Sequence, residues 1–456
     1  MIAKKANSTQ MTFYLTFEEQ LNHRHPLYVL ADKIDWQMFE DEFAKHYSPD
    51  QGRPAKPIRL LTGLLLLKHI RNLSDESVVE QWQENAYYQY FCGITSFVTG
   101  EPSELVHFRN RIGTAGMELI LKESVRLNGK DGKEKDVCVD TTVQEKNITF
   151  PTDNKLYRKI IQKSIAIADA EDIELRQSYS RTIKKLSYQQ RFRRNKKQQK
   201  LSRKADRKIK TIAGRPARRT HNVLVAGGLV RELERKLTST ALTRHSTSLE
   251  LFKRVLAQKR SDSNKIYSLH EPHVQCISKG KEHKKYEFGN KVSLMITKTT
   301  GVIVGALSLE KNDYDGHTLQ PALEQYKRFY GTEPRKAIAD LGYRGVDKIG
   351  ETDVITPNKK ATTYYGKVKL RADHRRRSSI EAGISHLKNN HRLGRNFYRH
   401  IAGDETNVLL SASAYNFKRM MRKWKEMFKY FLSIFYYVLR LLFVPSKSYP
   451  VLKMTF

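Results

Sequence analysis

The chain has 456 residues and carries 83 Lys and Arg against 48 Asp and Glu, which gives a formal net charge of +35. A hydrophobic content of 39% excludes a disordered chain, and the basic excess predicts a polyanionic partner, most often nucleic acid, with an anionic membrane surface as the alternative. Three widely separated cysteines, the lack of a signal peptide and the lack of a long apolar run predict a cytoplasmic protein with reduced thiols and no membrane span.

The N-terminal part, up to about residue 130, has a helical pattern. Trp36, Phe39 and Phe43 repeat at spacings of three and four, as one face of a buried helix does. Two helices within residues 58–85, joined by a polar turn at residues 71–74, could form a helix-turn-helix that recognises DNA and helps to pair two protomers. A simple helical hairpin without DNA contact is the alternative. We therefore expect an all-helical N-terminal domain over residues 1–130.

The pattern changes after residue 135. Residues 136–143 form a short β-branched run typical of a buried strand, and residues 155–260 then read as a basic helical insert. Residues 181–220 contain 17 Lys or Arg and a single acid, interleaved with apolar positions. We expect this block to bind nucleic-acid phosphates, and a solvated face is the alternative. The candidate contacts are Arg191, Arg193, Arg194, Lys196 and Lys197.

Further strands follow the insert. Residues 291–298 and 302–309 read as a hairpin, a helix begins at about residue 315, and residues 336–340 and 354–357 read as short buried strands. A helix and a C-terminal helical region come last. This order predicts an α/β layer with a mixed sheet. The expected division is a domain over residues 131–425, interrupted by the insert, and a C-terminal helix and tail over residues 426–456.

Residues 374–388 carry the first chemical signal. On a helix, His374, Arg377, Glu381 and Lys388 fall in one stripe beside an apolar stripe. A carboxylate between cations stays ionised and suits a metal ion, while the cations suit phosphates. A plain ion pair from Arg377 to Glu381 on a solvated helix is the alternative.

Two more acids complete a candidate set. Asp140 and Asp340 each end a predicted buried strand, where acids are not favoured, and Glu381 lies on the following helix. Three converging carboxylates repel one another unless divalent cations neutralise them, and such hard ligands favour Mg²⁺, for which Mn²⁺ can substitute. Two such ions about 4 Å apart can activate a water or a 3′-hydroxyl for in-line displacement at phosphorus. Each Asp alone is also a common turn residue.

Several motifs resemble those of one family. One motif resembles part of the Y-R-E-K signature of DDE transposases from bacterial insertion sequences. It consists of Arg377, Glu381 and Lys388, with three residues between the first two and six between the last two. Other strings are similar to the insertion-sequence family numbered five. These are residues 52–57, 63–68, 72–76, 84–91, 286–291, 315–319 and 339–345. The resemblance extends from about residue 15 to residue 425.

The resemblance implies a ribonuclease-H-like catalytic core that cuts double-stranded DNA at the element's terminal inverted repeats and joins the freed 3′ ends to target DNA. It implies that Asp140 contacts both metal ions, while Asp340 and Glu381 each contact one. Arg377 and Lys388 would hold the DNA backbone near the reacting phosphate.

One position departs from the family signature. The signature has Tyr three residues before Arg377, where this chain has His374, which can still donate to a phosphate. Joining two element ends predicts a homodimer in the synaptic complex, in a bacterial cytoplasmic protein associated with the nucleoid. The alternatives are a metal-dependent nuclease on the same core and an inactive or regulatory DNA-binding protein derived from a transposase.

Overall fold

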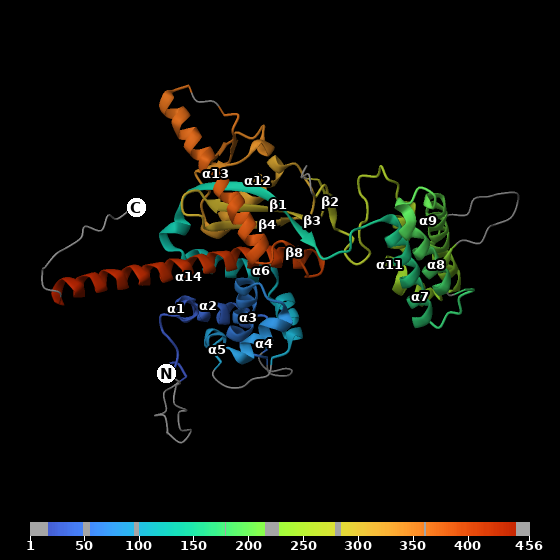
Figure 1. The fold of residues 1–456 in the computed structure, drawn as a ribbon, viewed down its shortest axis with the longest axis horizontal. Helices are drawn as coiled ribbons and strands as arrows, with labels where there is room; N and C mark the ends of the chain where they lie inside the picture. The colour runs from blue at the N-terminus through green and yellow to red at the C-terminus, as the bar shows by residue number, and fades with distance from the viewer. Residues whose placement is uncertain are drawn as a thin grey trace, which may run out of the picture.

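A computed structural model describes residues 17–48, 55–94, 100–177, 179–214, 228–278, 284–359 and 362–443. A central α/β body lies between a helical bundle on one side and the helix α13 on the other, and a separate helical lobe is joined to it by two extended segments (Figure 1). The central sheet contains both parallel and antiparallel pairs. The predicted α/β class with a mixed sheet is therefore confirmed.

The sheet is built around its longest strands. Its strand order is β2-β3-β1-β5-β7-β6, with β4 paired to β3 and β8 paired to β1. The main strands are β1 (Asp136–Lys146), β3 (Glu287–Thr297), β4 (Ile303–Leu309), β5 (Lys336–Ile338) and β7 (Thr352–Ile355). Three short strands escaped prediction because two or three residues carry no readable alternation. These are β2 (Gln275–Ile277), β6 (Lys348–Ile349) and β8 (Arg395–Asn396).

Alternation along β1 separates two cores. Val137 and Val139 face the cluster that holds the helix α12 (Asp315–Tyr330), while Cys138 between them faces the larger cluster. That larger cluster includes residues of α13 (Tyr364–Asn390) and α14 (His400–Phe443). Even-numbered positions of β1, including residue 140, therefore point toward α13.

The helical bundle contains α1 (Pro26–Lys33), α2 (Trp36–Ala44), α3 (Ile58–Arg71), α4 (Asp75–Glu84), α5 (Ala86–Phe91) and α6 (Pro102–Leu127). Its centre is α3, which is buried at every position from Leu60 to Ile70. The turn after α3 contacts the end of α13, where the side-chain amide of the exposed Asn72 donates to the carbonyl of Asn389 (3.2 Å).

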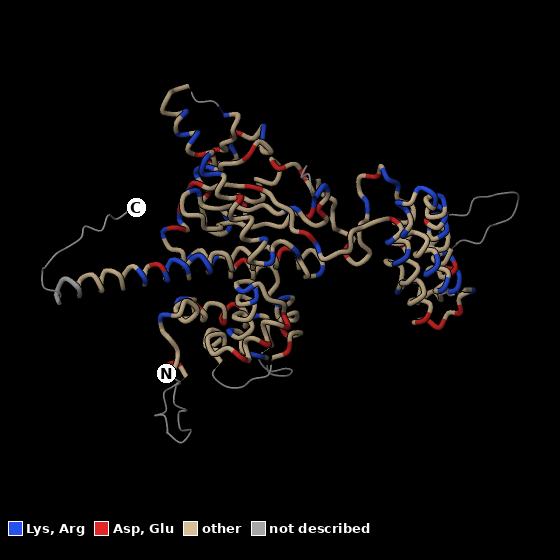
Figure 2. Tube along the Cα trace, in the orientation of Figure 1, with Lys and Arg blue, Asp and Glu red and all other residues tan. Residues whose placement is uncertain are grey.

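The lobe has a hydrophobic core of its own. It is formed by α7 (Asp153–Ala170), α8 (Ser180–Gln190), α9 (Gln199–Ala213), α10 (Leu229–Lys236) and α11 (Ser239–Ala257). Ile160, Ile209 and Phe252 lie at its centre and are fully buried. Lys and Arg are frequent along these helices (Figure 2), and most of those on α8 and α9 are exposed. The lobe can therefore present charge without disturbing the sheet.

The helix α14 runs unbroken through residue 426, where a boundary was expected from the sequence. Its last part projects beyond the α/β body (Figure 1). Large apolar side chains from Met427 to Val438 are exposed there. None of the helices in the described ranges is long and apolar enough to cross a membrane.

A buried ionic cluster fixes the junction between the sheet and the lobe. The ammonium of Lys146 at the end of β1 lies 2.7 Å from a carboxylate oxygen of Asp404 and 3.4 Å from one of Glu271. Asn290 and Asn396 also donate to Asp404 (2.8 and 2.6 Å). Both acids are about fully buried, so they depend on these donors.

We expect Lys146→Met to lower the free energy of unfolding by about 3–5 kcal/mol, because it leaves the carboxylates of Asp404 and Glu271 buried without their cation. Chemical denaturation of variant and wild type measures the difference. Lys45→Met is the control, since Lys45 pairs with Glu42 at the surface, where such a pair contributes about 0–1 kcal/mol. Equal losses in the two variants would contradict this interpretation.

Candidate active site and nucleic-acid interface

The parallel register of β1 and β5 determines where the two aspartates lie. Cys138 pairs with Ile338, so two residues further on Asp140 comes beside Asp340. Asp340 is the second residue after the end of β5, and its carboxylate accepts from the backbone N–H of Gly342 (2.8 Å). Asp140 does not end its strand as predicted, because β1 continues to Lys146 along the antiparallel partner β3.

Glu381 approaches Asp140 through a shared cation. The guanidinium of Arg377 lies 3.8 Å from a carboxylate oxygen of Asp140 and 3.3 Å from one of Glu381. The side chain of Glu381 is 63% exposed, whereas that of Asp140 is 17% exposed. The ion pair foreseen as the alternative is thus present, and the same guanidinium also links α13 to β1.

A fourth carboxylate, which the sequence reasoning missed, belongs to Asp315 at the start of α12. It accepts from the hydroxyl of Thr141 and from the ammonium of Lys291, each at 2.9 Å. A Cβ atom added to Gly342 would lie 2.7 Å from Asp315 Oδ2 and 2.9 Å from Asp340 Oδ1, so the two acids flank this glycine. The signal available in the sequence was an acid placed soon after a strand.

The charges of these acids act on the phenol of Tyr343. Its ring is fully buried. Burial raises the pKa of the Tyr343 phenol, and the charges of Asp315, Asp140 and Asp340 raise it further. Three carboxylates therefore act on one hydroxyl, which stays protonated.

The donor types fit a hard divalent ion, because carboxylate oxygens are the ligands that Mg²⁺ and Mn²⁺ prefer. Within the described ranges, no three Asp, Glu, His or Cys side chains lie close enough together to hold a metal ion. The carboxylate of Glu381 is directed to Arg377, and those of Asp140 and Asp315 also lie beside cations of the protein.

The remaining predicted residues of α13 lie along the same helix. His374 is half-buried, and neither ring nitrogen has a hydrogen-bond partner. Burial lowers the pKa of His374, with Arg377 acting in the same direction. The imidazole is therefore neutral near pH 7. Lys388 is half-buried near the end of the helix.

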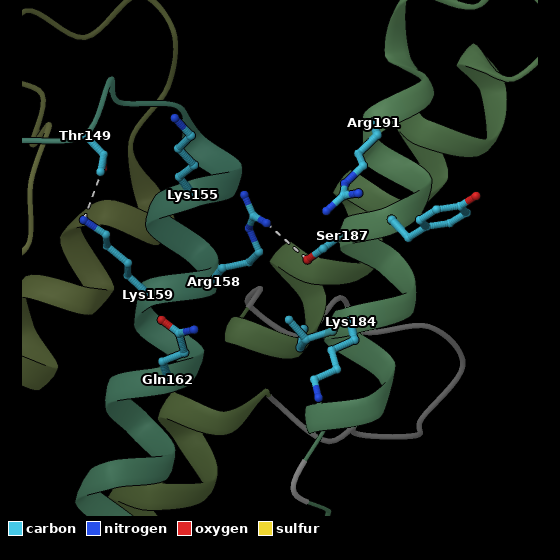
Figure 3. A pocket seen from close by; sticks show the side chains of 10 residues that line it. Thr149, Lys155, Arg158, Lys159, Gln162, Lys184, Ser187 and Arg191 are labelled. Atoms are coloured by element: carbon cyan, nitrogen blue, oxygen red, sulfur yellow. Dashed lines mark hydrogen bonds between the residues drawn. The ribbon is translucent and has the colours of Figure 1, made fainter.

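The lobe carries a basic hollow between α7 and α8, with a volume of about 620 Å³. Most of its side chains come from the facing helices α7 and α8, and Thr149 comes from the segment before α7 (Figure 3). Arg158 donates to the hydroxyl of Ser187 (3.1 Å), and Lys159 donates to that of Thr149 (3.4 Å). No acid lines it, and its cations are Lys155, Arg158, Lys159, Lys184 and Arg191.

The five basic residues predicted to contact DNA are all exposed at the end of α8 and in the turn that follows. They are Arg191, Arg193, Arg194, Lys196 and Lys197. Arg193 forms an ion pair with Asp206. The other four form no ion pair with any residue in the described ranges, so their charges are free to meet an anion.

Comparison with known proteins gives matches over two parts of the chain. A family described as a transposase DDE domain matches residues 161–417, and one described as a transposase domain (DUF772) matches residues 15–111. The first match includes Asp340 and Glu381 and begins after Asp140. A Rhizobium meliloti protein, the uncharacterized protein ORF8 in the nfe locus, is 44% identical over 173 residues, covering 36% of this chain and 83% of that protein. No solved structure matches the chain significantly.

We expect Gly342→Ala to lower the rate of DNA cleavage by about 100-fold. The added methyl group would displace the carboxylates of Asp315 and Asp340. A shift of about 1 Å in a reacting site has an effect of this size. Single-turnover cleavage measures the rate. Gly305→Ala is the control, since its methyl group would meet Met295 at 3.2 Å and no acid. Equal rates in the two variants would show that Gly342 has no such role.

Proposed function

The chain belongs to the DDE transposases, enzymes that cleave DNA and transfer its strands, and we propose that it acts at the terminal inverted repeats of an insertion sequence. It would cut the DNA there and join the freed 3′ ends to target DNA. The observation that carries this proposal is the parallel register that brings Asp140 beside Asp340, with Arg377 connecting Asp140 to Glu381.

We further propose a ribonuclease-H-like core in which the acids hold two Mg²⁺ ions, with Mn²⁺ as a substitute. Asp140 would contact both ions, and Asp340 and Glu381 one each. Such ions lower the pKa of a bound water or 3′-hydroxyl and stabilise the leaving oxygen. Arg377, once Glu381 has turned from it, is placed to neutralise a phosphate of the DNA backbone.

Further contacts to the DNA backbone would come from α13 and the lobe. His374 and Lys388 lie on the same helix as Glu381, before and after it. In the lobe, the exposed cations at residues 191–197 and the hollow between α7 and α8 offer many charges and few groups that read bases. We propose that the lobe binds phosphates with little sequence preference.

Two protomers would hold two element ends, in a protein associated with the nucleoid. The N-terminal helices over residues 58–85 would contribute to recognition of the repeat, with exposed Gln83 and Glu84 on α4 as candidates for base contacts. The projecting apolar end of α14 supports pairing with a second copy, since contiguous exposed apolar surface marks an interaction site. The domain boundaries proposed are those near residues 130, 155 and 260.

We expect Asp140→Asn, Asp340→Asn and Glu381→Gln each to abolish cleavage by many orders of magnitude while binding of end DNA persists, because each removes charge from the metal ligands and none from the basic surface. Mg²⁺-dependent nicking and joining of DNA that carries the element's own end measures the activity. Cutting by any one of these variants would refute the assignment. Wild-type cutting without joining would indicate a nuclease.

The lobe can be tested separately through salt dependence. Each neutralised phosphate contributes a slope of roughly −0.9 to the plot of log affinity against log salt. Changing Arg191, Arg194, Lys196 and Lys197 to Gln should therefore flatten the slope by about 2–4. Fluorescence anisotropy with duplex DNA measures it. A slope equal to that of wild type would mean that these side chains are only solvated.

A further inference from the structure

A second basic cavity lies where three helices meet, away from the four acids. It has a volume of about 450 Å³ and lies between the end of α3, the end of α13 and the middle of α14. Arg71, Lys418 and Arg422 line it together with two histidines, two asparagines and one isoleucine. Among the described residues, no acid lines this cavity.

The cations in this cavity lack counter-charges. Within the described ranges, Arg71, Lys418 and Arg422 form no ion pair with Asp or Glu. The guanidinium carbon of Arg71 lies 5.8 Å from the centre of the Tyr88 ring, and its Nε is buried without a hydrogen-bond partner. A buried donor without a partner is costly, so this group favours an acceptor that enters the cavity.

The electrostatic effects on the lining residues agree with this geometry. Burial lowers the pKa of Lys418, and the charges of Arg71 and Arg422 lower it further. Burial also lowers the pKa of His391 to about 4, with Lys418, Arg422 and His386 acting in the same direction. The positive groups therefore repel one another, and an anion between them would remove that repulsion.

Capping of helix ends does not account for these cations. Positive side chains often neutralise the last carbonyl groups of a helix, and both α3 and α13 end here. Three of those carbonyls already accept from other donors. Leu73 N–H binds the carbonyl of Lys68 (2.8 Å), a ring nitrogen of His391 binds that of His69 (3.0 Å), and Asn72 binds that of Asn389.

We propose that this cavity binds a phosphate of the DNA backbone, next to the DNA that occupies the active site. The proposal rests on the proposed function. His386 and Asn390 are five and nine residues beyond Glu381 on α13, which places them about 7.5 and 13.5 Å along the helix axis and about 140° and 180° around it. The exposed face of α13 lies between Glu381 and these residues, so a phosphate in the cavity would belong to DNA that passes over this face beyond the reacting phosphate.

The site would link the N-terminal helices to the catalytic helix. Arg71 and Asn72 belong to the helical bundle, His386 and Asn390 to the helix that carries Glu381, and the lysine and arginine to α14. A phosphate bound by all three elements would fix α13 along the DNA, because contacts to the backbone set position and orientation.

The test uses the full chain and the double variant Lys418→Gln/Arg422→Gln. Its control is Lys425→Gln/Lys429→Gln, which removes the same charge from exposed positions of α14 outside the cavity. With duplex DNA carrying the element's end, the cavity variant should bind about tenfold more weakly than the control and lose about 0.9 from the salt slope. Its unfolding midpoint without DNA should stay equal or rise, because unpaired cations are removed.

Ethylation of single DNA phosphates gives a second measurement. One phosphate near the cleavage site should block wild-type binding when ethylated and have no effect on the cavity variant. Equal slopes and equal interference patterns for the cavity variant and the control would overturn the proposal. The proposal would also be overturned if inorganic phosphate stabilised the wild type while the cavity variant bound DNA as tightly as the control. That result would indicate a site for small anions. If either of these results is found and the wild type still cuts DNA that carries the end of its own element, the proposed function stands while this inference fails.

Discussion

Repulsion among carboxylates is the constraint on which the rest of the structure depends. Asp140, Asp340 and Asp315 approach one another because strand register and the start of α12 place them there. Such a group is stable only with cations nearby. In the described structure, Arg377 and Lys291 supply that charge. The negative charge of these acids is thus balanced by cations of the protein itself.

The lobe shows how a long insertion can leave this site intact. Residues 147–274 separate β1 from β2, yet β1 and β3 pair over nine residues. The lobe buries a hydrophobic core of its own, so its folding depends little on contacts with the sheet. The cluster of Lys146, Asp404 and Glu271 ties both ends of the insertion to α14. The lobe therefore adds its basic surface without altering the pairing of β1 with β3.

Part of the fold and of the candidate site could be predicted from the sequence, and part could not. The acids Asp140 and Asp340 stood out because short apolar runs precede them, and the spacing of Arg377 and Glu381 is a local helical property. Asp315 was missed because it meets the first strand through Thr141, which is 174 residues away in the chain. The contact of the turn at residues 71–74 with α13 depends likewise on packing between segments more than 300 residues apart.

The central claim is that Asp140, Asp340 and Glu381 form one two-metal site. Anomalous diffraction from crystals of the protein with end DNA and Mn²⁺ tests it most directly. The account predicts two manganese peaks about 4 Å apart, with Asp140 touching both and Glu381 turned away from Arg377. Manganese bound elsewhere, or an ion pair between Arg377 and Glu381 that persists with the metal and DNA bound, would contradict it.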